Sequence, residues 1–533
     1  MKTVLSLLAL VGLAACSPGA SDSAVDTAPY ANITRTGYFD EPAGAGSDVV
    51  DETDWRSPFI TREQAQGDLQ ALDSLLEHRY AYTDADELDE ETVFAVISDA
   101  LPERIRVGDF AMQLQKALAL SIDGHAPRIN GERPDGARER IEDNPPGSHY
   151  FPFQLRSTGA GRIVAFDAEE RGLIDEEHPY VLSIDGQYAS DWIYSIQDII
   201  VDGSPQLKWH RGSRHLSNIG FMRIEVGAPA SETAEVVFQN EAGSSQLTRT
   251  VRLVSESVAS ADRYPFAEDA LARVPSEVAY FRLRRMEGDE RYIDSLAAWI
   301  QGQRDARGAI IDIRDNGGGS RLPLLTLLPH VLSADASPVV VTAGKLKLPA
   351  ECLMTACPAP EDGYLADRFM RPLHGFVEGT SERAALDLWL PTFKPEWTPP
   401  EGGFSDWHYL VISPDADPVF ERKPVIVLMN NANFSAADIF LSGFKGRQNV
   451  LLMGTASSGG SARRMEHVLP NSGLAVSLAT LASFEARSST LYDGVGIQPD
   501  LEFASEPGFF VNASDDVLDQ AISLIRSFGG NWF

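Results

Sequence analysis

The sequence predicts an α/β protein with a mainly parallel central sheet, and two observations support this prediction. From Val278 onward, short apolar runs typical of buried strands alternate with helical patterns. Two of these runs, at residues 308–320 (GAIIDIRDNGGGS) and 423–440 (KPVIVLMNNANFSAADIF), end in a polar or glycine-rich corner that precedes a helix. Open α/β sheets place their active sites at such corners, where parallel strands end. The sequence therefore predicts a site formed by these two corners.

The remaining elements of this half follow from the same alternation. Strands are expected at residues 278–283, 309–313, 339–342, 425–429 and 450–453. Helices are expected at residues 292–300, 322–332, 435–445 and 514–527. A Pro-, Trp- and Gly-rich insertion, from about Lys345 to Arg422, separates the third strand from the fourth.

The amino-terminal half reads differently. Residues 55–129 have helical spacing, as in Leu69, Leu72 and Leu76, and the last helical stretch stops at residues 121–125 (SIDGH). Residues 150–255 read as short strands broken by Gly, Asp and Ser. These patterns predict a helical unit followed by a β unit, and the Asp-Gly pair at residues 185–186 predicts a hairpin turn within the β unit.

Composition excludes some functions. The net charge is −32 and no basic stripe is present, so the chain is not expected to bind nucleic acid. No metal or organic cofactor is implied. Cys352 and Cys357 have the spacing C-x4-C without a neighbouring histidine, which favours a disulfide in an oxidising compartment over a metal site.

The first residues read as a targeting segment. Lys2 precedes an apolar stretch, Val4 to Ala15, which is too short to span a bilayer and ends in Leu-Ala-Ala-Cys16. This ending resembles the bacterial lipobox, which implies cleavage before Cys16 and acylation of that residue. The alternative is an ordinary secretory signal with a chance cysteine. Ser17, in place of an aspartate, favours anchoring to the outer membrane of a Gram-negative cell.

Ser435 and the glycines at residues 317–319 are the candidate chemical groups. Ser435 opens a helix, whose amides and dipole favour the negative charge of an acyl-transfer intermediate, although serine at this position is often only an N-cap. The glycines can bring backbone N–H groups close to a substrate, or form a simple turn. No Gly-Lys-Ser/Thr follows them, which excludes a phosphate loop, and no G-x-S-x-G elbow is present.

Four ordered motifs resemble those of the tail-specific, or C-terminal-processing, serine peptidases. Residues 312–319 (DIRDNGGG) resemble the segment DlRgNgGG, and residues 433–438 (NFSAAD) resemble tASAaE. Residues 454–460 resemble the G-x-x-T-x-G turn, and residues 494–500 (GVGIQPD) resemble G-V-x-PD. The resemblance covers about residues 275–505. It implies a crotonase-like peptidase core of ββα units, preceded by an N-terminal helical domain and a PDZ-like domain. A generic β domain is the alternative for the latter.

The family implies two ways of activating the serine. One uses a lysine near the T-x-G turn, but this chain has Gly460 there and no lysine after Lys445. Arg463 and Arg464 cannot replace it because a guanidinium stays protonated. Lys445 lies ten residues along the helix from Ser435, which is about 15 Å by helix rise. A Ser–Lys dyad is therefore not expected.

The other design belongs to the tricorn-like branch, which takes a histidine from a DgH segment. Asp123-Gly124-His125 resembles that segment, so the resemblance implies His125 as the base for Ser435. It also implies an acid just before G-V-x-PD, here Asp493, with Asp123 and then Asp438 as fallbacks. Backbone N–H groups near Gly318 and of Ala436 are the oxyanion-hole candidates.

The chain is thus expected to be a serine endopeptidase of the cell envelope, acting on peptides or proteins and held at a membrane by its lipid. The alternatives are a catalytically degenerate peptide-binding scaffold of the same fold and a hydrolase acting on esters. The sequence makes no prediction about oligomeric state. The expected division is 1–15 signal peptide, 16–52 flexible tether, 53–140 helical domain, 141–258 PDZ-like domain, 259–344 and 411–510 peptidase core, 345–410 insertion or lid, and 511–533 C-terminal helix.

Overall fold

The structure is a computed structural model of the 533-residue chain. It describes residues 32–39, 50–51, 53–83, 85, 89–125, 128–142, 147–167, 169, 171–197, 199–200, 203–255, 271–349 and 359–529. The predicted signal peptide, the lipidation site Cys16 and the cysteine pair Cys352 and Cys357 lie outside the described residues. In the described part, no helix is long and apolar enough to cross a membrane.

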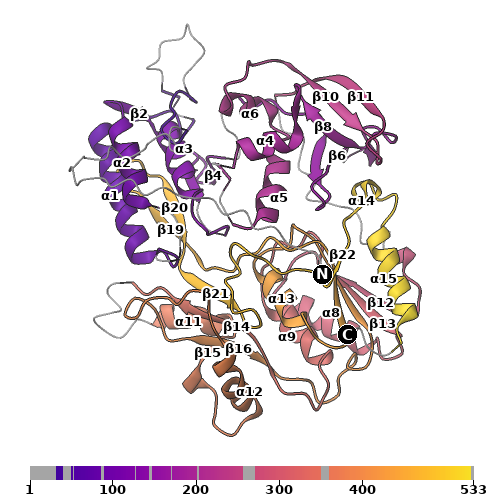
Figure 1. The fold of residues 1–533 in the computed structure, drawn as a ribbon. Coiled ribbons are helices and arrows are strands. Elements are labelled where there is room, and N and C mark those ends of the chain that lie inside the picture. Colours follow the sequence, from indigo (N-terminus) through magenta and orange to yellow (C-terminus); the bar gives the residue numbers. More distant parts are fainter. Residues whose placement is uncertain are drawn as a thin grey trace, which may run out of the picture.

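A five-stranded parallel sheet forms the centre of the carboxyl-terminal half, as predicted (Figure 1). Its strands, in spatial order, are β12 (Val278–Arg282), β13 (Gly308–Asp312), β17 (Val425–Met429), β18 (Val450–Gly454) and β22 (Leu501–Glu502). Every residue of β13, β17 and β18 is buried. Burial on both faces explains why these strands are uninterrupted apolar runs in the sequence.

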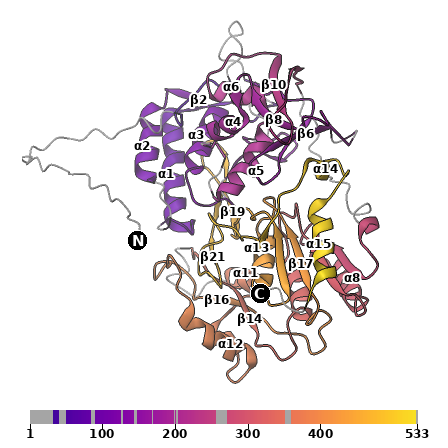
Figure 2. The same cartoon turned by 45° about the vertical axis from the view of Figure 1, so that its right-hand side comes forward.

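Helices cover both faces of this sheet. On one face lie α8 (Glu290–Gln301), α9 (Leu322–Leu327) with the 3-10 turn η2 (Leu328–His330), and α13 (Ala436–Phe444); on the other lies α15 (Asp516–Ser527). Successive side chains of a strand point to opposite faces, so Val425 and Val427 of β17 pack with the first group, whereas Ile426 and Leu428 pack under α15. Figures 1 and 2 both show α15 on the opposite side of the sheet from α13.

The predicted insertion does not stand apart from the core. Its strands β15 (Arg371–Pro372) and β16 (His408–Ile412) join β14 (Val339–Leu346) and β21 (Leu481–Glu485) in one antiparallel sheet. The segment also contributes α11 (Ala359–Asp367), α12 (Ser381–Trp389) and the 3-10 turns η3 (Leu373–Gly375) and η4 (Leu390–Thr392). It therefore extends the core and brings α11 towards the site described below.

The amino-terminal helical part is joined to the core by a shared sheet. It contains β1 (Phe59–Thr61), α1 (Arg62–Arg79), α2 (Glu90–Ala100), β2 (Arg104–Arg106) and α3 (Val107–Leu118). The strands that follow α3, β3 (Arg128–Glu132) and β4 (Arg138–Arg140), pair with β20 (Ala475–Ala479), which pairs with β19 (Arg464–Val468). This pairing brings the SIDGH segment, immediately before β3, to the core.

Residues 32–39 correct the expected extent of the tether. Ile33 and Tyr38 are buried in the core of the helical part, at 4% and 6% exposure. The buried ammonium of Lys116 donates to the Tyr38 hydroxyl at 2.5 Å and to the Asn32 carbonyl at 3.1 Å. Lys116 also pairs with the buried side chain of Glu225 at 2.8 Å. Because Ile33 and Tyr38 are buried and the segment supplies two acceptors to this lysine, residues 32–39 belong to the folded body and are not a flexible tether.

A separate antiparallel sheet follows the helical part. It contains β5 (Gln154–Ser157), β6 (Ile163–Asp167), β7 (Gly172–Leu173), β8 (Tyr180–Ile184), β9 (Gln187–Tyr188), β10 (Thr233–Gln239) and β11 (Gln246–Arg252), with α4 (Ala189–Ser195), α5 (Pro205–His215) and α6 (Ile219–Glu225) packed against it. Asp185 and Gly186 form the predicted hairpin turn between β8 and β9, and both have positive φ (51° and 78°). The short helix α14 (Pro507–Phe510) packs on β6.

Candidate active site

Ser435 occupies a strained turn between β17 and α13. Its backbone has φ 61° and ψ −120°, a region that costs about 1–3 kcal/mol for a residue with a Cβ. The side chain caps no amide of α13, so the N-cap reading of this serine does not hold. The hydroxyl is instead left to face a cavity, as a nucleophile requires.

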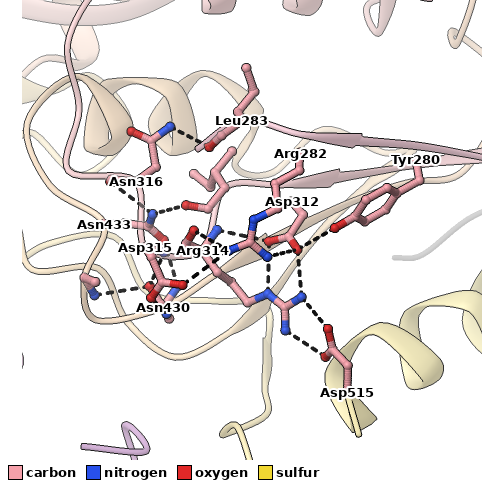
Figure 3. A network of polar contacts seen from close by, with 12 residues as sticks. Tyr280, Arg282, Leu283, Asp312, Arg314, Asp315, Asn316, Asn430, Asn433 and Asp515 are labelled. Carbon is pink, nitrogen blue, oxygen red and sulfur yellow. Dashed lines mark hydrogen bonds and ion pairs between the residues drawn. The ribbon is translucent and has the colours of Figure 1, made fainter. Parts of the chain in front are cut away.

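Asparagine side chains fix the two corners against each other (Figure 3). The Asn433 amide donates to the carbonyl oxygens of Ile313 and Asn316, which belong to the corner after β13. Asn316 in turn donates to the Leu283 carbonyl at 2.7 Å. Because Asn316 and Asn433 are completely buried, each of these hydrogen bonds is costly to lose, and the glycine turn is held beside Ser435.

A network of ion pairs also supports the corner after β13 (Figure 3). Arg314 donates to Asp312 and to Asp515 at the start of α15, both at 2.7 Å, and Arg282 donates to Asp312 at 2.9 Å. Burial alone would raise the pKa of Asp312, but Arg282 and Arg314 outweigh it and hold that pKa well below its usual range. The network ties the end of β13 to α15 without touching the reactive serine.

His125 reaches Ser435 from the amino-terminal part of the chain. Its Nε2 lies 3.0 Å from Ser435 Oγ. The His125 amide donates to Asp123 Oδ1 at 2.8 Å, and Arg211 of α5 donates to the Gly124 carbonyl at 2.8 Å, so both sides of the turn are held. The ring of Phe434 stacks on the imidazole with centroids 5.1 Å apart.

The imidazole of His125 is kept neutral by its surroundings. Desolvation is the largest cause, and Arg128 and Arg211 add to it, so that the pKa of His125 falls from 6.5 to about 3. Nδ1 is inaccessible to solvent and has no hydrogen-bond partner among the described residues. A neutral imidazole at 3.0 Å can accept the proton of Ser435.

Asp493 lies in the same buried region but does not hydrogen-bond to His125. Its Oδ2 accepts from the Tyr82 hydroxyl at 2.7 Å and from the Ser461 amide at 3.3 Å. Its Oδ1 is buried and has no partner among the described residues. Burial raises the pKa of Asp493 to about 6. The direct carboxylate–imidazole contact expected from the sequence is therefore not formed: Tyr82 and Ser461 bond to Oδ2, and neither Oδ1 nor His125 Nδ1 has a partner among the described residues.

The two fallback acids are also engaged elsewhere. Asp123 Oδ1 accepts from the backbone of His125 and not from its ring. Asp438 Oδ1 accepts from the Ser457 hydroxyl at 2.5 Å, and burial raises the pKa of Asp438 well above its usual value. Among the described residues, no carboxylate hydrogen-bonds to the His125 ring.

The glycine turn approaches Ser435 so closely that a side chain would not fit. A Cβ on Gly318 would lie 2.6 Å from the Phe434 carbonyl oxygen and 2.8 Å from the Ala436 nitrogen. The Gly318 amide, however, already donates to Asn316 Oδ1 at 2.9 Å. Gly319, next along the turn, lines the cavity together with Ala436.

The site has no room for a lysine side chain at position 460, which the alternative Ser–Lys dyad would need. A Cβ on Gly460 would lie 2.5 Å from the ring of Phe434, so the aromatic ring occupies the space that a longer side chain would need. Lys445 donates to Asp500 at 2.5 Å and to the Gln498 carbonyl at 2.9 Å. The chain therefore pairs a bulky residue 434 with a glycine at 460.

Ser435 and His125 open into a cavity of about 460 Å³. We call it the arginine pocket, because five guanidinium groups line it: Arg128, Arg321, Arg368, Arg463 and Arg464. Tyr364 and Arg368 come from the predicted insertion. These arginines and Tyr82 were not predicted as site residues, since they are scattered over the sequence and belong to no motif quoted above.

The chain is similar to known proteins in both sequence and fold. Residues 277–503, somewhat under half of the chain, match the sequence profile of peptidase family S41. No curated protein matches the chain. The fold is similar to the crystal structure of mature CPAF, with 18% identity, a TM-score of 0.57 and coverage of 88% of this chain and 99% of that one. It is also similar to mature CPAF complexed with lactacystin, with 17% identity, a TM-score of 0.54 and coverage of 87% and 98%.

Proposed function

Because this chain belongs to peptidase family S41, the tail-specific serine peptidases, and is a serine-type hydrolase, we propose that Ser435 and His125 form its catalytic centre. The observation that carries the proposal is the distance of 3.0 Å between His125 Nε2 and Ser435 Oγ. In the tautomer with the proton on Nδ1, the Ser435 hydroxyl donates to Nε2. His125 takes this proton as Ser435 attacks a peptide carbonyl, and later passes it to the leaving amine.

The oxyanion of the tetrahedral intermediate needs preorganised donors. We assign this role to the Ala436 amide at the start of α13 and to the glycine turn. The Gly318 amide is engaged by Asn316, so the Gly319 amide is the better donor from this turn. The strained backbone of Ser435 directs its hydroxyl and the following amide to the same cavity.

Asp493 acts on His125 at a distance in this proposal. No carboxylate orients the imidazole directly, and Phe434 holds the plane of the ring by stacking. Asp493, when ionised, favours the imidazolium that forms during the reaction, and Tyr82 and Ser461 fix its position. We therefore assign Asp493 an electrostatic role and no role in orienting the imidazole.

Peptide cleavage by variants tests the proposal. Ser435→Ala and His125→Ala are each expected to lower kcat/KM on an unstructured protein substrate by about 10³-fold or more. Ser295→Ala and His78→Ala are matched controls, since both side chains are exposed, on α8 and α1, and outside the site. Full activity of either site variant refutes the assignment. If the correctly folded wild type also cleaves no peptide, the result favours the peptide-binding scaffold.

Two finer parts of the proposal rest on sequence patterns. We propose that the antiparallel sheet β5–β11 is a PDZ-like unit that binds an extended chain end by strand addition. We also propose that Cys16 carries lipid and anchors the protein at the outer membrane, which exposes the site to envelope polypeptides. Incorporation of labelled palmitate by the wild type, and not by Cys16→Ser, tests the anchor.

A further inference from the structure

The arginine pocket is unusual because it is strongly positive in a strongly negative protein. The chain has a net charge of −32, yet five guanidinium groups and no aspartate or glutamate line this cavity in the part of the chain that the structure describes. Like charges confined to one cavity repel each other more strongly than they do in water. An anion bound in such a cavity would relieve this repulsion.

Four of the five pocket arginines lack a carboxylate within ion-pair distance among the described residues, although Glu142 raises the pKa of Arg128. Arg128, Arg321, Arg368 and Arg464 form no ion pair with any described residue. Arg321 is only 5% exposed, and the one acceptor it has among the described residues is the Arg368 carbonyl at 3.0 Å. A guanidinium carries five N–H donors, so a buried one with a single partner is suited to bind a further acceptor.

The buried Arg321 and the half-buried Arg128 both remain charged at neutral pH. Desolvation lowers the pKa of Arg321 and of Arg128, in each case to about 10, which is still well above neutrality. For Arg128 the nearby Arg140 and Arg211 add to the effect, and Glu142 opposes it. The pocket therefore presents real positive charge beside Ser435.

An adjoining cavity contains a carboxylate whose pKa reports on the charge of this region. It measures about 470 Å³ and shares Arg128 and Phe434 with the arginine pocket. It contains Glu142, whose burial would raise its pKa. His215, Arg140 and other neighbouring cations outweigh burial and lower it. A carboxylate that is only 13% exposed is thus kept ionised here by the surrounding positive charge.

We propose that the arginine pocket binds carboxylates of the peptide substrate beside the scissile bond, and so makes the enzyme selective for acidic substrates. The proposal rests on the proposed function of Ser435 and His125. Guanidinium groups bind carboxylates through two parallel hydrogen bonds, which gives both affinity and geometric selectivity. The carboxylate can come from an aspartate or glutamate side chain or from the free carboxyl end of the chain.

A carboxylate bound in this pocket would also affect His125. Arg128, Arg464 and Arg368 are among the groups that lower the pKa of His125. Partial neutralisation of these charges makes the imidazolium less unfavourable and so strengthens His125 as a base. Acidic substrates should therefore have a higher kcat as well as a lower KM.

Quenched decapeptides in three matched sets test the proposal. The first set scans a single Glu around the cleaved bond, the second has Gln at the same positions, and both have amidated ends. The third set has the Gln sequences with a free carboxyl end. Side-chain recognition predicts that kcat/KM for the best Glu peptide exceeds its Gln partner by about tenfold or more, and recognition of the chain end predicts this gain in the third set. Equal rates in all three sets overturn the proposal.

Variants connect any preference to the pocket. Arg368 is half-buried and Arg464 exposed, so the double variant Arg368→Gln/Arg464→Gln should fold. It is expected to reduce the preference to about threefold or less. The control is Arg422→Gln, whose side chain is 90% exposed outside the pocket, and it should keep the full preference. A preference that survives unchanged in the double variant contradicts the proposal.

Binding separates this proposal from the catalytic one. Fluorescence anisotropy of the same peptides on Ser435→Ala measures recognition without cleavage. Tighter binding of carboxylate-bearing peptides to Ser435→Ala, lost when Arg368→Gln and Arg464→Gln are added, supports the pocket even if cleavage follows another route. Cleavage without any such difference in binding or rate retains the catalytic proposal and refutes the pocket.

Discussion

Titration of His125 should contribute little to the pH dependence of Ser435 reactivity between pH 5 and 8. An unperturbed histidine base with a pKa of 6.5 would be about 3% neutral at pH 5, so reactivity would fall about 30-fold from pH 8 to pH 5. Desolvation and the neighbouring Arg128 and Arg211 lower the pKa of His125 to about 3. With that value the imidazole is about 99% neutral at pH 5, and the fall should be less than twofold.

The assay is the second-order rate of labelling by an uncharged fluorophosphonate, measured from pH 4.5 to 8.5. An uncharged probe avoids titration of substrate carboxylates. Burial raises the pKa of Asp493 to about 6, so its titration must be separated from that of His125 by repeating the profile in Asp493→Asn. An acid limb near pH 6.5 that persists in Asp493→Asn would show that His125 has an ordinary pKa and refute the reasoning.

Three further predictions concern the surroundings of the centre. Ser435→Gly should be more stable than Ser435→Ala by about 1 kcal/mol in denaturant unfolding, because the φ of 61° strains a residue with a Cβ; equal stabilities would argue against strain. Gly460→Ala should lower kcat by about tenfold or more, measured at a temperature where circular dichroism shows the variant to be folded, because a methyl group there would lie 2.5 Å from the Phe434 ring that stacks on His125; unchanged kcat would contradict this. Burial raises the pKa of Asp493 to about 6 from 3.8 in the unfolded chain, so the native state holds the proton more tightly and this group's stabilisation is lost as pH rises from about 4 to about 6. The stability difference between wild type and Asp493→Asn should change over that window, and a constant difference would contradict the shifted pKa.

The parallel sheet was predictable because its signal is local. The predicted strand at residues 425–429 coincides with β17, and the strand at 309–313 differs from β13 by one residue. Both are buried on two faces, so every position is apolar and no register has to be inferred. The corners after these strands were predicted for the same reason, since a polar or glycine-rich turn after a buried strand is visible in the sequence.

Long-range contacts were not predictable in this way. The antiparallel pairing of β3 with β20 joins segments far apart in the chain, and neither strand carries a signal for its partner. The family resemblance placed His125 near Ser435, but residue patterns alone gave no reason for that contact. The arginine pocket draws on β3, α11 and the chain around β19, so its charge appears only after folding.

Two differences from expectation involve buried polar groups. Asp493 was expected to contact His125, but its Oδ2 accepts from Tyr82, and its Oδ1 has no partner among the described residues. Residues 32–39 were expected to be part of a tether, but Tyr38 and the Asn32 carbonyl accept from the buried ammonium of Lys116, which also pairs with Glu225. In both cases a buried polar group selects a partner that composition and periodicity do not reveal.

The most direct test of the central claim is to locate the covalent adduct of a fluorophosphonate by mass spectrometry in the wild type and in His125→Ala. The account predicts a single adduct on Ser435, formed about 10³-fold more slowly when the imidazole 3.0 Å from its hydroxyl is removed. An adduct on a different serine, or labelling of Ser435 at an undiminished rate in His125→Ala, would contradict it.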